Sequence, residues 1–300
     1  MILKFCLTIA GLALISCIED HHFPTMSTNK SLLWEISGNG MEKPAYIFGT
    51  MHLLCPDDAM LGDSLKKIIK NVDEIYFEID LDNMSELFSG AMQGKMKNDT
   101  SLRDLYKPEE YERIKDFFNG RGLSLEFNFM SSMQPLLISA LVDQAMLACP
   151  QLDGMEMNIM QESRQYRKEI KGLETVAFQV SVLENFPYSM QAKELLKSVD
   201  SFETYKKQMN EMVRLYKEQD IEGLLDYSLQ SDTAISEMQD VMIDRRNANW
   251  AEQFPSIVKG KKILIAVGAG HLGGEKGLLN LLRKKGYTIR PVQNVVAVLI

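Results

Sequence analysis

Two histidines, His52 and His271, stand in the same short pattern and could bind one metal ion together. His52 ends the sequence Gly-Thr-Met-His after an apolar run, and His271 ends Gly-Ala-Gly-His after another; leucine follows each. Glycine after a buried strand allows a tight turn, which would leave both imidazoles at the carboxyl ends of strands, where open α/β sheets bind their ligands. Neutral imidazole is the commonest metal ligand. The repeated pattern predicts a shared site, and the alternative role for each ring is that of a structural core residue.

A carboxylate is expected to complete such a site, because two histidines alone would leave it underfilled. Glu78 is the leading candidate. It lies in residues 73–81, which alternate as a strand does, with Phe77 and Ile79 facing away from it. An unpaired carboxylate among apolar neighbours would be costly, which indicates that Glu78 has a partner.

A competing interpretation uses residues 268–273, which fit the dinucleotide-binding pattern G-x-G-x-x-G. That pattern requires an acidic residue about 20 positions further on, at the end of the next strand. The sequence offers Arg290 there and no acid, and only 27 residues follow Gly273. The context therefore argues against a nucleotide site. The helical zinc-protease motif HExxH is absent.

The elements expected to position these residues are strands at both ends of the chain with helices between them. We predict an α/β (α+β) fold, in which a mixed central sheet formed by the N- and C-terminal strands carries a large helical insertion. The expected elements are a hairpin at 31–50 with its turn at 38–40, a helix at 63–71, a strand at 73–81, helices over 84–167, a strand at 169–174, helices to about 250, a strand at 261–267, a helix at 274–285 and a strand at 287–299.

Composition and charge exclude several classes of protein. Hydrophobic residues make up 45% of the 300 residues and charged residues 25%, as in globular proteins, which excludes a largely disordered or collagen-like chain. The net charge is −8, from 41 acidic and 33 basic residues. An acidic chain gains no counterion-release energy from a phosphate backbone, so nucleic acid is not an expected partner.

The N-terminus resembles a bacterial lipoprotein signal. One lysine precedes a short apolar run, and residues 14–17 read Leu-Ile-Ser-Cys. We predict a signal peptide at 1–16, a tether at 17–30 that starts at a lipidated Cys17, and a folded domain at 31–300. Such a protein is exported and anchored to a membrane, where it faces the periplasm or the cell surface. An ordinary cleaved signal with an incidental Cys17 is the alternative.

Two cysteines, Cys55 and Cys149, remain in the predicted domain, and each is followed by proline. In an oxidising compartment such a pair more often forms a disulfide than a metal site. We therefore predict a disulfide between them. The alternative is that Cys55, three residues after His52, is a thiolate ligand or a nucleophile.

Several segments together resemble the TraB/GumN family, which includes the TIKI proteins, and the resemblance extends over residues 32–291. The TIKI members are described as divalent-metal-dependent proteases that work with manganese or cobalt. The resemblance therefore implies a divalent cation, and zinc is a further possibility. The segments that carry it are GTMH, IYFEID, KGLETVAFQ, DRRNANW and VGAGHLGGEKGLLNLLRKKGYTI.

The resemblance also implies roles for particular residues. The matching metal ligands are His52, His271 and Glu78. The family's further glutamate and its Arg-Asn pair match Glu174 and Arg246-Asn247.

These features lead to the hypothesis of a lipid-anchored, exported, metal-dependent hydrolase, most simply a peptidase, with a peptide or protein substrate. Glu78 or Glu174 would take a proton from the attacking water. Arg246 would stabilise an oxyanion or, alternatively, pair with Asp244 on the surface, and Gln179 would lie either in the cleft or on the surface. The competing hypothesis is a non-catalytic protein that captures a peptide or small ligand in the same cleft. The sequence makes no prediction of oligomeric state.

Overall fold

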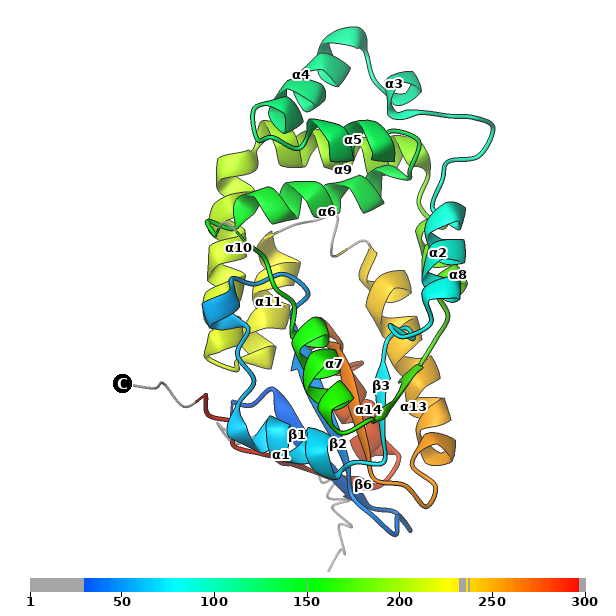
Figure 1. The fold of residues 1–300 in the computed structure, drawn as a ribbon, viewed down its shortest axis with the longest axis vertical. Helices are drawn as coiled ribbons and strands as arrows, with labels where there is room; N and C mark the ends of the chain where they lie inside the picture. The colour runs from blue at the N-terminus through cyan, green and yellow to red at the C-terminus, as the bar shows by residue number, and fades with distance from the viewer. Residues whose placement is uncertain (1–29, 150, 232–235, 237, 297–300) are drawn as a thin grey trace, which may run out of the picture.

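The structure, a computed structural model, describes residues 30–149, 151–231, 236 and 238–296. The predicted signal lies outside the described residues, as does the predicted tether apart from Lys30. The described residues contain one six-stranded sheet in the order β4-β3-β5-β2-β1-β6 (Figure 1). Its strands are β1 (Leu33–Gly38), β2 (Ala45–Thr50), β3 (Glu74–Phe77), β4 (Glu169–Gly172), β5 (Ile263–Gly268) and β6 (Tyr287–Pro291).

The predicted hairpin is present at the antiparallel side of the sheet. β1 pairs with β2, and β6 pairs with the other edge of β1. The turn between β1 and β2 contains Gly38, Asn39 and Gly40, all with positive φ of 46–80°. Glycine and asparagine tolerate this left-handed region best, which is why the tight turn forms at these residues. The predicted mixed sheet of N- and C-terminal strands is thus confirmed.

The other half of the sheet is parallel and places the two Gly-x-x-His segments side by side. β5 lies between β2 and β3 and runs parallel to both. Thr50, the last residue of β2, pairs with Gly268, the last residue of β5. Both strands are made of apolar runs and are buried, as is usual for parallel strands that helices cover. His52 and His271 therefore leave the sheet from neighbouring strands at one edge.

Three predicted strands end earlier in the structure. β3 ends at Phe77 rather than 81, so Glu78 follows the strand and does not lie inside it. β4 ends at Gly172 rather than 174, although Leu173 and Glu174 still donate backbone hydrogen bonds of 2.9 and 3.0 Å to the carbonyls of Phe77 and Glu78. β6 ends at Pro291 rather than 299, because Pro291 already pairs with Trp34 near the start of β1. Residues 297–299 of that prediction lie outside the described residues.

Helices flank the sheet and form a cap at the top of Figure 1, where α3, α4, α5, α6 and α9 gather. None of the described helices is long and apolar enough to cross a membrane. The helices are η1 (Pro56–Asp58), α1 (Asp63–Asn71), α2 (Met84–Gln93), α3 (Leu102–Leu105), α4 (Pro108–Asn119), α5 (Ser124–Met130), α6 (Pro135–Met146), α7 (Met155–Gln165), α8 (Val176–Leu183), α9 (Tyr188–Asp200), α10 (Phe202–Lys217), α11 (Ile221–Ser231), the π-helix η2 (Asp240–Asp244), α13 (Arg245–Ile257), η3 (Ala269–His271) and α14 (Leu278–Lys284).

The cap has an apolar core of its own, separate from the core around the sheet. Phe118 stacks on Phe127 with ring centroids 4.7 Å apart, and Phe117 meets Phe202 edge-on at 5.1 Å. Such aromatic pairs contribute beyond the area that they bury. The cap can therefore hold its shape above the sheet edge where the histidines emerge.

Asp143, on α6 in the cap, provides a test of this packing through the pH dependence of stability. Burial raises the pKa of its carboxyl to about 6, so the folded state favours the neutral form. The free energy of unfolding should fall as pH rises from about 4 to 6. Asp143→Asn is expected to stabilise the protein at pH 7 by up to about 3 kcal/mol and to leave it unchanged at pH 3.5. Urea unfolding at both pH values measures this, and an equal gain at both would contradict it.

Candidate active site

The three predicted metal ligands meet around Gly268, at the end of β5. The backbone nitrogen of Gly268 donates a hydrogen bond of 2.9 Å to Glu78 Oε1. A side-chain carbon added to Gly268 would lie 3.3 Å from Glu78 Oε1, 3.6 Å from His271 Cδ2 and 4.0 Å from His52 Nε2. Glycine is needed here because any side chain would fill the space that the three groups share. The structure thus brings His52, His271 and Glu78 to one point.

His271 is buried and held in one orientation. Its Nδ1 lies 2.7 Å from Asn247 Oδ1, and its ring packs on Trp250 with centroids 4.5 Å apart. Burial lowers the pKa of His271 to about 4, so the imidazole is neutral at neutral pH. An amide oxygen accepts a hydrogen bond, which places the proton on Nδ1 and makes Nε2 an acceptor; Arg246 Nη1 lies 3.3 Å from this Nε2. Nε2 lies 3.8 Å from Glu78 Oε1.

His52 is oriented in the same way by Glu156, the second residue of α7. Its Nδ1 lies 2.6 Å from Glu156 Oε1, although the histidine side chain is 68% exposed. Contact with this carboxylate raises the pKa of His52, to about 9. The sequence analysis missed Glu156, which lies 104 positions after His52 among methionines and shares no motif with it.

Arg246 lies between the two carboxylates of the site. It donates from Nη2 to Glu78 Oε2 at 2.5 Å and from Nε to Glu174 Oε1 at 2.8 Å, and its side chain is buried. The guanidinium also donates to the Met242 carbonyl at 2.9 Å, at the end of the π-helix η2. The surface alternative for Arg246 is wrong, because Asp244 pairs with Lys276 instead.

The charge of Arg246 keeps its carboxylate partner Glu78 ionised. Burial alone would raise the pKa of the Glu78 carboxyl, but the neighbouring His271 and Arg246 outweigh that effect and hold the pKa well below its usual range.

Glu174 is more deeply buried than Glu78, since their side chains are 3% and 13% exposed. Oε1 accepts from Arg246 and, at 3.0 Å, from Gln179; Oε2 accepts from the Trp250 indole at 3.1 Å. Gln179 also donates to Glu78 Oε2 at 3.2 Å, so it lies in the site rather than on the surface. Trp250 is a further site residue that the sequence analysis did not single out. These contacts indicate that Glu174 holds Arg246 in position.

A cavity of about 490 Å³ opens beside this cluster. His52, Glu78, Gln179 and Arg246 line it, and apolar side chains of the cap and of α8 line the rest. A polar cluster at one end of a largely apolar cavity is typical of sites that bind small molecules or single side chains of larger ligands.

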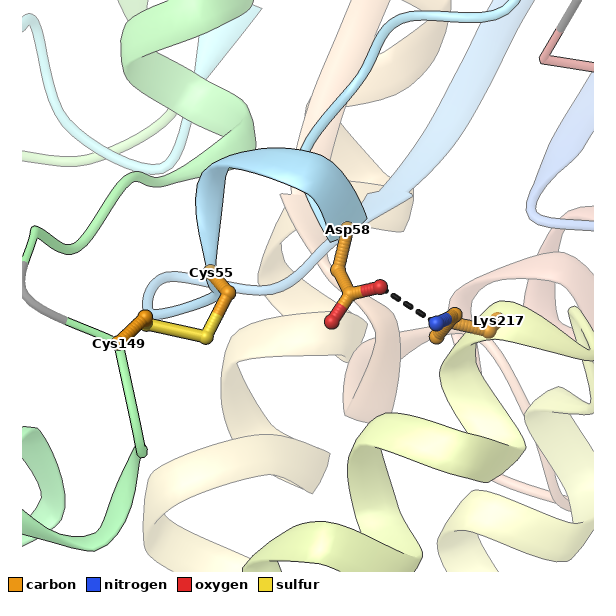
Figure 2. Close-up of a disulfide and its surroundings, with 4 residues drawn as sticks. All are labelled: Cys55, Asp58, Cys149 and Lys217. Carbon is orange, nitrogen blue, oxygen red and sulfur yellow. Dashed lines mark ion pairs between the residues drawn. A yellow bond between two sulfur atoms is a disulfide. The ribbon is translucent and has the colours of Figure 1, made fainter. Parts of the chain in front are cut away.

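The predicted disulfide between Cys55 and Cys149 is confirmed (Figure 2), with Cα atoms 5.8 Å apart. It joins the loop after His52 to the segment before α7. Two further backbone hydrogen bonds of 2.9 Å connect Leu54 and Asp153, and Met155 donates to the Met51 carbonyl. The disulfide and these bonds hold His52 against the segment that carries Glu156. With Cys55 in a disulfide, the thiolate-ligand and nucleophile alternatives are wrong.

Removing the disulfide in the double variant Cys55→Ser/Cys149→Ser is expected to lower the free energy of unfolding by about 2–4 kcal/mol. The bond closes a loop between residues 94 positions apart, and losing it frees the unfolded chain. Differential scanning calorimetry of the two proteins measures the difference.

The matched control is Asp58→Asn, which removes the neighbouring ion pair with Lys217 that Figure 2 also shows. This pair is partly exposed and should contribute under about 1 kcal/mol. A double cysteine variant no less stable than Asp58→Asn would show that the disulfide does not constrain the fold.

The residues of the site fit a divalent cation in chemistry and orientation. Metal-bound histidines usually have their second ring nitrogen held by a carboxylate or carbonyl oxygen, as Glu156 and Asn247 hold His52 and His271 here. In the part of the chain that the structure describes, however, no three His, Cys, Asp or Glu side chains are close enough together to hold a metal ion. The positive charge that contacts Glu78 Oε2 and Glu174 in this arrangement is Arg246.

The fold and site define a class of α/β protein in which two parallel neighbouring strands each end in Gly-x-x-His beside a buried Arg–Glu cluster. The profile of the TraB/PrgY/gumN family matches residues 32–291, so the chain belongs to this family.

Relatives with known names share low sequence identity but long coverage. The chain is 24% identical to the uncharacterized protein YbaP of Escherichia coli strain K12, over 79% of this chain and 87% of YbaP. It is 19% identical to metalloprotease TIKI2 of Danio rerio, over 96% of this chain and 67% of TIKI2. It is 20% identical to metalloprotease TIKI1 of the same organism, over 86% of this chain and 62% of TIKI1. No solved structure matches this chain significantly.

Proposed function

We propose that this protein is a metal-dependent hydrolase that cleaves peptide bonds in the cavity beside Glu78. The observation that carries the proposal is the pair of imidazoles, each anchored through Nδ1, that meet Glu78 Oε1 around Gly268. The names of two relatives, both metalloproteases, support the same class of reaction.

The residues of the chain have separate roles in this proposal. His52, His271 and Glu78 would hold a divalent cation; manganese and cobalt are the first candidates, and zinc is a third. Such a cation polarises a peptide carbonyl and lowers the pKa of water. Arg246, which lines the cavity, would pair with the negative charge that develops on the substrate. Glu174 has no role in proton transfer in this proposal, because Glu78 and not Glu174 is among the residues that line the cavity; Glu174 is a positioning residue that holds Arg246.

The test is the metal content of the purified protein after exchange into manganese, cobalt or zinc buffer. We expect about one equivalent in the unmodified chain and under a tenth of that in His52→Ala and His271→Ala. His22→Ala, in the predicted tether, is the matched control and should keep its metal. Equal metal content in all four proteins, or none in any, would refute the site.

A second candidate function is capture of a peptide without cleavage. The ion pairs of Arg246 with both carboxylates favour it, because they neutralise the site without a metal ion. Incubation with peptides distinguishes the two: a hydrolase releases fragments at many times its own amount, whereas a binding protein retains intact peptide at one equivalent.

We further propose that the protein is exported and carries a lipid anchor at Cys17. The disulfide supports it, because such bonds persist mainly in oxidising compartments. In a bacterial host, Cys17→Ser should move the protein from the detergent-soluble membrane fraction to the soluble exported fraction, whereas Cys6→Ser in the predicted signal should not. A Cys17→Ser protein that stays in the membrane fraction would refute lipid anchoring.

A further inference from the structure

The apolar part of the cavity beside Glu78 has walls from several elements far apart in sequence. The cavity, of about 490 Å³, lies within the usual range of ligand sites. Its largest apolar lining residues come from α2, the end of α5, the loop that follows it, the start of α6, α8 and η2. In this order they are Leu87, Met130, Met133, Leu137, Leu183 and Met242.

From this cavity we infer a substrate class: the site selects peptides that place a large apolar side chain, such as leucine, methionine or phenylalanine, beside the group bound at Arg246. The inference rests on the proposed function, because it assigns the ligand of the same site.

The polar end of the cavity favours a peptide over a plain hydrocarbon chain. Arg246 and Gln179 line this end as N–H donors and Glu78 lines it as an acceptor, and in this structure they pair with one another. A peptide backbone carries one donor and one acceptor at nearly every residue, so it can match both kinds of group. A hydrocarbon chain carries neither, so it could match the apolar walls of the cavity but not its polar end.

Exposed apolar side chains continue from the lining of the cavity to the surface. On α2, Met84 is 72% exposed and lies one turn before Leu87, which lines the cavity; Phe88, also 72% exposed, lies one turn after Met84. Phe129 is 80% exposed and precedes Met130, another lining residue. Apolar surface of this kind marks binding sites more often than free surface. It indicates that residues flanking the inserted side chain are also apolar.

Three of the six large apolar lining residues are methionines, at 130, 133 and 242. Methionine is unbranched and polarisable, so it adapts to differently shaped apolar groups. The subsite should therefore accept several large apolar side chains but reject charged and small polar ones. Burial of such a side chain corresponds to roughly 10- to 100-fold in affinity.

The experiment measures peptide binding rather than cleavage. The metal-free full-length protein is incubated with twenty mixtures of acetylated, amidated hexapeptides, each with one residue type fixed at position 3. Bound peptides are recovered by gel filtration and quantified by mass spectrometry. We expect the leucine, methionine and phenylalanine mixtures to be enriched 10- to 100-fold over those with serine or aspartate.

Two variants, Leu137→Trp and Met130→Trp, fill the cavity from partly buried positions that tolerate a larger side chain more readily than the core. Both should lose the enrichment while keeping the melting temperature within a few degrees. Met157→Trp, an exposed site on α7 outside the cavity, is the matched control and should keep it.

Failure of this inference can be told apart from failure of the proposed function. Enrichment without cleavage in metal buffers would support the subsite and refute the hydrolase. Cleavage without apolar enrichment would support the hydrolase and refute the subsite. Enrichment that survives in both cavity variants, or binding of dodecanoate with no selection among peptides, would overturn the inference.

Discussion

Glu78→Gln is expected to reduce peptide hydrolysis by about 100- to 1,000-fold, the effect of removing a single preorganised charged group from an active site. Glutamine has the same shape, so the cavity stays intact. The charge that faces both imidazoles is lost, and with it a ligand for the proposed cation. Arg246 keeps its second partner, Glu174, so the fold should remain stable. Turnover of the hexapeptide mixtures, followed by mass spectrometry, and calorimetric titration with manganese measure the two effects.

Glu252→Gln is the matched control for this prediction. Glu252 has the same side chain, is 74% exposed and pairs with Lys285 at the surface. It should keep full turnover and full manganese affinity. If Glu78→Gln retains turnover within a factor of three of that control, Glu78 is neither a ligand nor a participant in the reaction.

The sequence predicts the fold well where the signal is local. The turn residues 38–40 and the apolar runs of β2 and β5 each contain the pattern that produces the element. The end of β6 could not be predicted, because it depends on contact with another strand, the pairing of Pro291 with Trp34.

The residues of the site also fall into those that a local sequence motif indicates and those that it does not. The two Gly-x-x-His segments could be found because each is a short motif at the end of an apolar strand. Glu156 could not, because nothing in its neighbourhood indicates that it contacts His52. The choice between Glu78 and Glu174 also required the structure, since of the two it is Glu78 that lies around Gly268 with both histidines and lines the cavity.

Arg246→Gln is expected to destabilise the protein by about 3–5 kcal/mol at pH 7, because it leaves two buried carboxylates without their positive partner. Glu78 and Glu174 have side chains only 13% and 3% exposed, so water cannot replace the guanidinium. Glutamine is neutral and two bonds shorter than arginine, so the loss at a single pH combines charge and packing. Urea unfolding followed by circular dichroism measures it.

The dependence of this loss on pH separates charge from packing. In the unmodified protein the pKa of Glu78 is depressed, so its stabilising contribution is present above about pH 4.5 and is lost as pH falls toward 2. Without Arg246 the folded-state pKa of the Glu78 carboxyl should rise, and the variant should lose stability as pH rises through 4.5. The difference between the two proteins should therefore shrink by at least half between pH 7 and pH 4.

The neighbouring Arg245→Gln is the control, since the pair of Arg245 with Asp240 is exposed and contributes under about 1 kcal/mol. A second variant, Arg246→Gln/Glu174→Gln, also removes one of the two buried carboxylates that lose their partner. It should recover part of the stability at pH 7. A constant difference between Arg246→Gln and the unmodified protein at both pH values would mean that the guanidinium acts through its packing against Trp250. In that case the carboxylates are not held ionised by Arg246, and the proposed division of roles between Glu78 and Glu174 would be wrong.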